Sequence, residues 1–178
     1  MRSFYLLVVL LLIFSCKNSK NATEEPDSSI IPVHYLESCP DNGICSIQVM
    51  HQTNLLVKTD ETGKFYPVTE KGESLVIKYV YKRNSDENIA DSNYSEIIYF
   101  ELPDTKLNLN LQDKDLSQVK LLYGRLCFCR DASGYFPVTK GKLITEKTGK
   151  NQLKIVLNFS MKKIPQIIKQ IDETVDLN

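Results

Sequence analysis

Apolar residues recur at every second position in short stretches along most of the chain after residue 30. Leu107, Leu109 and Leu111 alternate with asparagine, and residues 153–161 carry an apolar side chain at each odd position. A two-residue period places one row of side chains in a core and the other row in water, which is typical of a half-buried β-strand. Gly, Asn and Asp residues separate such stretches roughly every 8–12 residues, a spacing that is typical of an all-β domain.

The sequence predicts about eight or nine strands joined by short turns. Residues 119–128 are apolar on both faces and contain no proline, which favours a central strand. The clearest strands are predicted at residues 74–82, 94–102, 107–111, 119–128 and 153–161. Shorter strands are predicted at residues 45–50, 54–59, 64–68 and 135–138. This number of short strands indicates a single antiparallel β-sandwich.

The last segment, residues 162–175, fits two structures. Pro165 suits the first turn of a short helix, and five branched apolar residues have helical spacing: Ile164, Ile167, Ile168, Ile171 and Val175. Two lysines at the start of the segment and two acidic residues near its end oppose the dipole of such a helix. The sequence therefore leaves open a final strand or a short C-terminal helix, and the fold class is the same in both cases.

The first sixteen residues follow a different pattern. One basic residue, Arg2, precedes an unbroken apolar run over residues 4–14, and Ser15 and Cys16 follow. This run is too short to cross a bilayer as a helix, which takes roughly 17–25 residues. A basic start, a short apolar core and a small residue before the cut are the features of a cleavable secretory signal. We therefore expect residues 1–15 to be removed on export.

Residues 13–16, Ile-Phe-Ser-Cys, resemble the lipobox of bacterial lipoproteins. The resemblance implies cleavage before Cys16 and lipidation of that cysteine, which becomes the mature N-terminus. Phe14 departs from the pattern, in which a small residue is commoner at this place.

Residues 17–29 contain one small apolar residue and no aromatic residue, which predicts a solvated tether with a mean span of roughly 18–22 Å. A polar tether after a lipidated cysteine is similar to that of small outer-membrane lipoproteins of the Bacteroidetes. This similarity implies a lipid-anchored location at the bacterial outer membrane, on its periplasmic or its cell-surface face. The expected organisation is a signal peptide (1–15), the lipidated cysteine with its tether (16–29) and a β-sandwich domain (30–178).

Charge is balanced along the 178-residue chain, which has 22 Lys and Arg residues against 22 Asp and Glu residues. Loss of Arg2 with the signal leaves one acidic residue in excess. A neutral, mixed surface lacks the basic footprint that nucleic-acid binding requires, and it lacks a polybasic segment for attraction to a membrane surface. The expected membrane contact is therefore the lipid bilayer through the acylated Cys16, since two or more acyl chains are enough for stable anchoring.

Four cysteines remain besides Cys16: Cys39, Cys45, Cys127 and Cys129. An even number in an exported chain favours structural disulfides over a thiolate metal site. Cys127 and Cys129 on an extended strand would have α-carbons nearly 7 Å apart, at the limit for a disulfide. The sequence therefore favours cross-links from these two cysteines to the region 39–45. A Cys39–Cys45 bridge that closes its own turn is the alternative.

Residue types suited to catalysis are sparse, so we expect no enzyme activity and no cofactor. His34 and His51 are the only histidines, and neither lies in a hydrolase motif. Together with Cys39 and Cys45, these histidines are residue types that bind zinc, but their spacing matches no short zinc-knuckle motif. Residues 85–93 are rich in oxygen-bearing side chains but lack the regularly spaced ligands of a calcium-binding loop. The Cys127–Cys129 pair lacks the Cys-x-x-Cys spacing and the helix start that support redox catalysis.

The sequence thus favours a binding or accessory module over an enzyme, with an envelope protein or a glycan as partner. A glycan site would stack sugar rings on exposed aromatic residues, and the candidates are Phe65, Tyr66, Tyr79, Tyr81, Tyr135 and Phe136. Most of these alternate with apolar neighbours, and the chain has no Trp, which favours packing roles for them. A structural subunit of an outer-membrane complex is the alternative, which predicts an exposed apolar patch or an unpaired strand edge. A hydrolase would require His34 or His51 beside a carboxylate and a hydroxyl in a cleft.

Replacement of Cys16 by alanine tests the anchor. We expect the Cys16→Ala protein to leave the membrane fraction, because the acyl chains are its only predicted membrane contact. Cell fractionation with immunodetection measures this, with the unchanged protein as control. Retention of the variant in membranes would show that another anchor exists.

Overall fold

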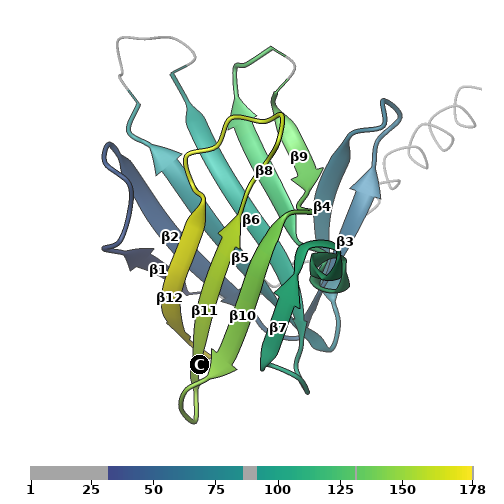
Figure 1. Ribbon diagram of the computed structural model, residues 1–178, viewed down its shortest axis with the longest axis vertical. Helices are drawn as coiled ribbons and strands as arrows, with labels where there is room; N and C mark the ends of the chain where they lie inside the picture. The colour runs from purple at the N-terminus through teal and green to yellow at the C-terminus, as the bar shows by residue number, and fades with distance from the viewer. Residues whose placement is uncertain (1–31, 86–91, 131, 178) are drawn as a thin grey trace, which may run out of the picture. The chain divides into compact units, whose positions relative to one another are not determined.

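The computed structural model describes residues 32–85, 92–130 and 132–177, which form twelve β-strands in two antiparallel sheets (Figure 1). The predicted signal peptide (1–15) and the lipidated cysteine with its tether (16–29) lie outside the described residues. The all-β antiparallel sandwich that the sequence predicts is confirmed.

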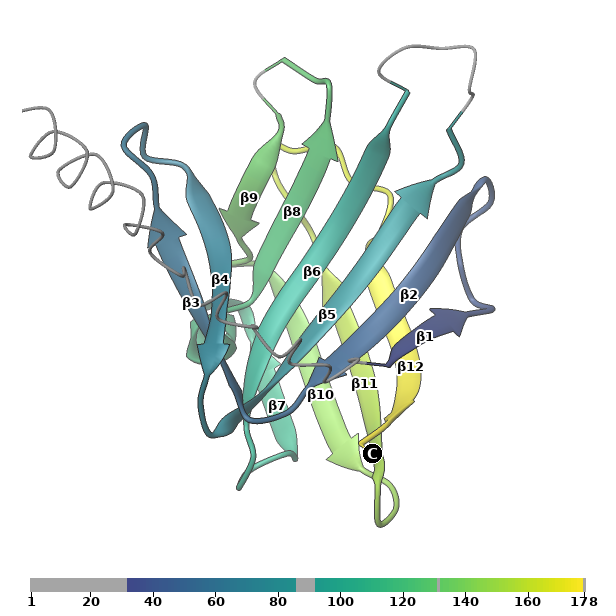
Figure 2. The same ribbon diagram turned by 180° about the vertical axis from the view of Figure 1, so that it is seen from behind.

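Sheet one contains eight strands in the order β1-β2-β5-β6-β8-β9-β4-β3. Their bounds are β1 Val33–Leu36, β2 Gly43–Met50, β3 Thr53–Thr59, β4 Phe65–Lys71, β5 Ser74–Arg83, β6 Tyr94–Pro103, β8 Leu122–Cys127 and β9 Gly134–Pro137. Sheet two has the order β12-β11-β10-β7, with β7 Leu109–Gln112, β10 Gly141–Lys147, β11 Gln152–Phe159 and β12 Gln170–Asp176. A 3₁₀ helix, η2, spans Asp113–Val119 between β7 and β8. Figure 2 shows sheet one in front of sheet two.

The nine stretches predicted as strands correspond to β2–β9 and β11, and β8 is central as expected. The predicted number of eight or nine is nevertheless too low, since the described residues also contain β1, β10 and β12. β1 is a four-residue edge strand without a buried residue. In β10 only Leu143 and Thr145 are buried. Both strands therefore lack the apolar alternation that made the other strands recognisable.

The C-terminal segment forms a strand, so the short helix left open by the sequence is wrong for the described residues. β12 pairs with β11 over its whole length and buries Ile171 and Val175 on one face. Lys154 of β11 forms an ion pair with Asp172 of β12. In a helix the acidic residue would oppose the dipole, whereas in the sheet it meets a lysine across the strands.

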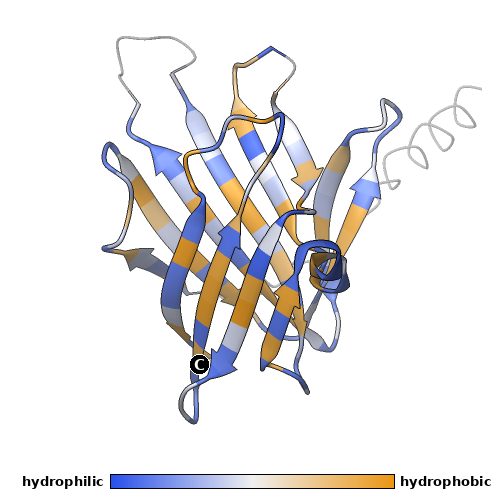
Figure 3. Cartoon of the chain, in the orientation of Figure 1, coloured by the Kyte–Doolittle hydropathy of each residue, from blue (hydrophilic) through white to orange (hydrophobic). Residues whose placement is uncertain are grey.

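The main core lies between the two sheets and is built from alternate residues of their strands, as the bands of apolar colour in sheet two illustrate (Figure 3). β6 contributes Ile98, Phe100 and Leu102, and β11 contributes residues at the same two-residue period. These side chains are almost fully buried, so the predicted period identifies the inward face of each strand correctly.

A second, smaller core covers the outer face of sheet one. β3 follows β2 through a two-residue turn but pairs with β4, and this β3–β4 hairpin packs on β5 and β6. Leu55 of β3 is thereby buried in one cluster with Met50, Val76, Tyr99 and Leu122. The two-residue period of β3 does not predict that Leu55 packs on β5 and β6, because β3 is far from these strands in the order of the sheet.

The end of the sandwich that carries the β1–β2, β3–β4, β5–β6, β8–β9 and β11–β12 connections is named the loop rim here (Figure 1, Figure 2). Its described residues are 37–42, 60–64, 84–85, 92–93, 128–130, 132–133 and 160–169. The strand register places these strand ends side by side. Cys45 pairs with Tyr81, Tyr81 with Glu96, and Glu96 with Arg125. The beginnings of β2 and β6 and the ends of β5 and β8 therefore lie at one level.

A methyl group at residue 124 tests the packing of the second core. Gly124 of β8 pairs with Tyr135 of β9, and a Cβ at 124 would overlap the Tyr135 ring. We expect Gly124→Ala to lower the free energy of unfolding by about 1–3 kcal/mol because the ring must move. Urea unfolding measures this. Gly149→Ala is the matched control, because its Cβ meets Gln152 at ordinary contact distance, and equal effects would contradict the explanation.

Candidate functional site

Both disulfides lie at the loop rim, and each closes locally: Cys39 with Cys45 and Cys127 with Cys129. The predicted cross-links between the two regions are therefore wrong. β5 and β6 separate Cys45 on β2 from Cys127 on β8, which puts the two cysteines about 14 Å apart at the usual strand spacing. β8 ends at Cys127 and the chain bends at Phe128, so the α-carbons of Cys127 and Cys129 lie 5.2 Å apart, within disulfide range.

The two disulfides have different surroundings. Cys45 is fully buried, and the Tyr79 hydroxyl donates a hydrogen bond to its Sγ at 3.0 Å. Burial, followed by the charges of Glu173 and Glu96, raises the pKa of Tyr79, so the hydroxyl keeps its proton. Cys127 and Cys129 are only partly buried, and Phe128 between them is 85% exposed. The Cys39–Cys45 disulfide therefore has one fully buried end, whereas both ends of Cys127–Cys129 are partly exposed.

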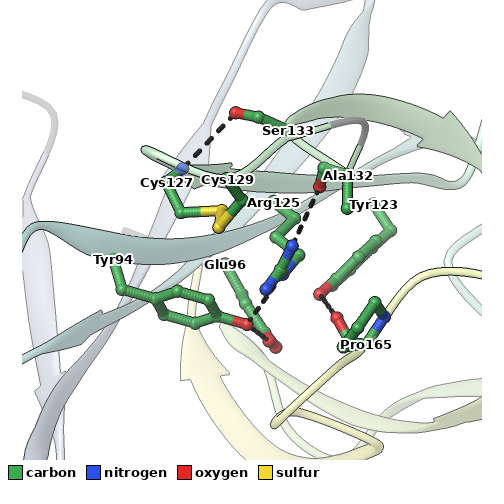
Figure 4. The surroundings of a disulfide bond; sticks show 9 residues. All are labelled: Tyr94, Glu96, Tyr123, Arg125, Cys127, Cys129, Ala132, Ser133 and Pro165. Atoms are coloured by element: carbon green, nitrogen blue, oxygen red, sulfur yellow. Dashed lines mark hydrogen bonds between the residues drawn. A yellow bond between two sulfur atoms is a disulfide. The ribbon is translucent and has the colours of Figure 1, made fainter.

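A buried carboxylate, Glu96 of β6, holds the β11–β12 connection against sheet one. Its Oε1 and Oε2 accept hydrogen bonds from the backbone N–H groups of Ile167 and Ile168, each at 2.7 Å. The Tyr94 hydroxyl donates a further bond to Oε1 (Figure 4). Burial of a carboxylate is costly unless its oxygens are satisfied by donors, and here three donors meet it. This arrangement is named the Glu96 clasp.

Arg125 of β8 balances the charge of the Glu96 clasp. Its Nε donates to the Tyr94 hydroxyl at 3.3 Å, its Nη1 donates to the Ala132 carbonyl at 3.2 Å, and its guanidinium lies 5.3 Å from the centre of the Tyr94 ring. The guanidinium of Arg83 lies 4.4 Å from the same ring. Burial, and then the hydrogen bond to Glu96, raises the pKa of Tyr94. The Tyr94 hydroxyl therefore keeps its proton and donates a hydrogen bond to the Glu96 carboxylate while it accepts one from the Arg125 guanidinium.

Tyr123 also holds the β11–β12 connection. It lies on β8, and its hydroxyl donates to the Pro165 carbonyl at 3.3 Å (Figure 4). Burial, followed by the charge of Glu96, raises the pKa of Tyr123 above its usual range. The β11–β12 connection is thus held by bonds from β6 and from β8, and its shape depends on sheet one.

A pocket of about 400 Å³ lies between the β3–β4 hairpin and the β8–β9 connection, and it is named the rim pocket. Its lining includes Lys64, Phe65, Cys129, Ser133, Tyr135 and Phe136. The volume is within the range of roughly 300–1,000 Å³ in which small ligands or partner side chains are held. Aromatic walls with the ammonium of Lys64 and the hydroxyls of Ser133 and Tyr135 suit an apolar group with a polar tip.

The structure sorts the aromatic candidates of the sequence into two groups. Phe65, Tyr135 and Phe136 come together at the rim pocket, and Tyr66 is exposed beside them on β4. Tyr79 and Tyr81 are buried in the main core, so they form no platform.

The metal-ligand candidates do not come together as a site. Cys39 and Cys45 are bonded to each other, which leaves no thiolate for zinc. His34 lies on β1, and His51 lies in the turn between β2 and β3. Among the described residues, no three His, Cys, Asp or Glu side chains gather where a metal ion would be held. Most of the oxygen-rich stretch 85–93 lies outside those residues.

Sequence reasoning missed Glu96 and Arg125, although a signal for each was present. Glu96 stands in the otherwise apolar row of residues 94–102, and Arg125 stands in a stretch that is apolar on both faces. A charged residue in a row that faces the core must find partners there. Which partners it finds depends on connections that lie far away in the sequence.

No protein-family model, curated protein or solved structure matches the chain significantly. Within the described ranges, no helix has the length and apolar character needed to span a membrane.

An amide in place of the buried carboxylate tests the Glu96 clasp. Glu96→Gln keeps the size of the side chain but turns one acceptor into a donor that faces other donors. We expect a loss of about 1–3 kcal/mol of unfolding free energy and faster proteolytic cleavage within residues 160–169. Urea unfolding and limited proteolysis measure these effects. Glu70→Gln, on the exposed face of β4, is the control with an expected change within about 0.5 kcal/mol, and similar results for both variants would contradict the clasp.

Proposed function

We propose that this protein is an exported binding module, anchored by acyl chains on Cys16 at the bacterial outer membrane, that captures an envelope protein at its loop rim. The export and anchor parts rest on the signal and lipobox pattern of residues 1–16. The binding part rests on one observation, which is the number of exposed apolar side chains at the loop rim, one of which, Phe65, lines the rim pocket.

Seven large apolar side chains are exposed among the described residues, and five of them lie at or next to the loop rim: Ile44, Phe65, Tyr66, Leu126 and Phe128. The other two lie on the edge strand β1. Scattered apolar residues are normal on a surface, but a gathering at one end marks an interaction site. Large aromatic residues around a pocket are the usual anchors of protein–protein contacts.

The rim is also built to keep its shape. Two disulfides and the Glu96 clasp fix three of its connections, and the side chains of Phe65 and Phe128 make none of these bonds. Loops positioned by a rigid sandwich are a common place for binding residues, because they vary without cost to the core. A preorganised surface loses less conformational entropy when it binds.

Site-specific photocrosslinking in intact cells tests this function. A photoreactive phenylalanine analogue replaces Phe128 at the rim or Lys150 in the β10–β11 turn at the other end of the sandwich. We expect a protein adduct of one defined mass from position 128 and at least tenfold less adduct from position 150. The adduct should decrease when Phe65 is also replaced by serine, because the pocket wall is then altered.

Three outcomes would contradict the proposal. Equal adduct formation from both positions would indicate chance encounters, and no adduct from position 128 would leave the rim without a partner. An adduct whose mass falls after glycosidase digestion to that of the free protein would identify a glycan instead. Unfolding curves of the two substituted proteins serve as the control for their folding.

A further inference from the structure

We propose that Cys127–Cys129 is an exchangeable disulfide that oxidises a thiol-bearing substrate at the loop rim, whereas Cys39–Cys45 is a structural brace. The inference goes beyond the proposed binding function and does not require it. It rests on a contrast between two disulfides in one protein, in ring size, exposure and neighbouring charge.

The first difference is ring size. Cys127 and Cys129 are separated by 2 positions in the sequence, and Cys39 and Cys45 by 6. A cross-link that closes a shorter loop removes less freedom from the unfolded chain. Cys127 is also held by β8, where it pairs with Tyr94, and its N–H donates to Ser133 Oγ at 3.4 Å. Opening of this disulfide therefore leaves the position of its strand intact.

The second difference is access. Thiol–disulfide exchange requires an incoming thiolate to reach one of the two sulfurs, and exposed disulfides are the labile ones. Cys129 is partly exposed and lines the rim pocket. Cys45 is fully buried and receives the Tyr79 hydroxyl at its sulfur. Cys39 is also partly exposed, so an attacking thiol meets partly exposed residues at both ends of Cys127–Cys129 but at only one end of Cys39–Cys45.

The third difference is charge. Arg125 extends from β8 two residues before Cys127, and Figure 4 shows its side chain in the surroundings of the disulfide, bonded to Tyr94 and Ala132. Arg130 follows Cys129 directly and is exposed. Neighbouring cations favour the thiolate form of cysteine, which makes it a better leaving group in exchange. This charge takes the place of the helix start that the sequence lacks here.

Phe128 supplies a contact for the substrate. It lies between the two cysteines in the sequence with 85% of its surface exposed, and the next residue, Cys129, lines the rim pocket. An apolar segment of a polypeptide that packs on this ring would bring its own cysteine to Cys129. The favoured substrate class is therefore an unfolded or extended polypeptide dithiol.

The reaction is a two-step exchange. A substrate thiolate attacks Sγ of Cys129, the Cys127–Cys129 bond breaks, and Cys127 leaves as a thiolate that takes up a proton from water. A second substrate thiolate then attacks the substrate sulfur of the mixed disulfide and releases Cys129. The substrate loses two electrons and becomes a disulfide, and the protein gains them as the Cys127/Cys129 dithiol.

Graded reduction of the processed, detergent-solubilised protein tests the contrast directly. Samples are equilibrated at increasing ratios of reduced to oxidised dithiothreitol, trapped with a maleimide and mapped by peptide mass spectrometry. We expect half-labelling of Cys127 and Cys129 at a ratio at least tenfold lower than for Cys39 and Cys45. Reduction of both pairs together, or of Cys39–Cys45 first, would overturn the proposal. The result depends on a small thiol, so absence of a crosslinked partner at the rim does not affect it.

Transfer to a polypeptide is tested with a synthetic dithiol peptide that contains one aromatic residue. The oxidised protein should yield up to one equivalent of peptide disulfide, and the double variant Cys127→Ser/Cys129→Ser should yield none. Phe128→Ser should react at the unchanged rate with dithiothreitol but at least threefold more slowly with the peptide. Peptide oxidation by the double variant would place the reactive disulfide elsewhere, and equal peptide rates would remove Phe128 from the substrate contact.

Discussion

The arrangement of the sandwich depends on two carboxylates of β6, one on each face of sheet one. Glu96 points into the core and accepts the backbone N–H groups of Ile167 and Ile168. Glu101 lies on the other face, where its Oε2 accepts the N–H of Leu55 at 2.5 Å and Lys120 Nζ donates to it at 2.9 Å. Each carboxylate thus ties a distant segment to the same strand by charge-assisted bonds.

The hydrogen bonds of Glu96 and Glu101 determine which connections and side chains lie at the loop rim. The Glu96 clasp positions the β11–β12 connection, and the Glu101–Lys120 pair, in which Lys120 Nζ also donates to the Leu55 carbonyl at 2.8 Å, positions the β3–β4 hairpin. The hairpin carries Phe65 to the rim pocket. A buried polar network is stabilising only while all its members are satisfied. The described residues contain no buried side-chain polar atom without a partner, so the buried Glu96 tie meets this condition, whereas the Glu101–Lys120 tie is partly exposed.

Much of the fold was predictable because strands are marked by the alternation of apolar and polar side chains over a few neighbouring residues. The inward residues of β6 and β11 follow from apolar side chains at every second position. The central place of β8 follows from apolar side chains on both of its faces. The favoured cysteine pairing was wrong, and the alternative Cys39–Cys45 bridge was correct. The error arose because β8 was expected to continue through Cys129, whereas it ends at Cys127. One bend at Phe128 brings the two α-carbons to 5.2 Å and reverses the conclusion.

The sequence by itself determined the fold class, the predicted export signal and the rows of residues that face the core, since each of these is encoded within a few neighbouring positions. Tertiary structure alone decided which aromatic residues meet at the rim pocket, which disulfide is exposed and what satisfies Glu96. Those outcomes depend on strand order, and strand order is set by pairings between segments that are far apart in the chain, such as Phe65 of β4 with Tyr135 of β9. No local pattern in the chain records such a distance.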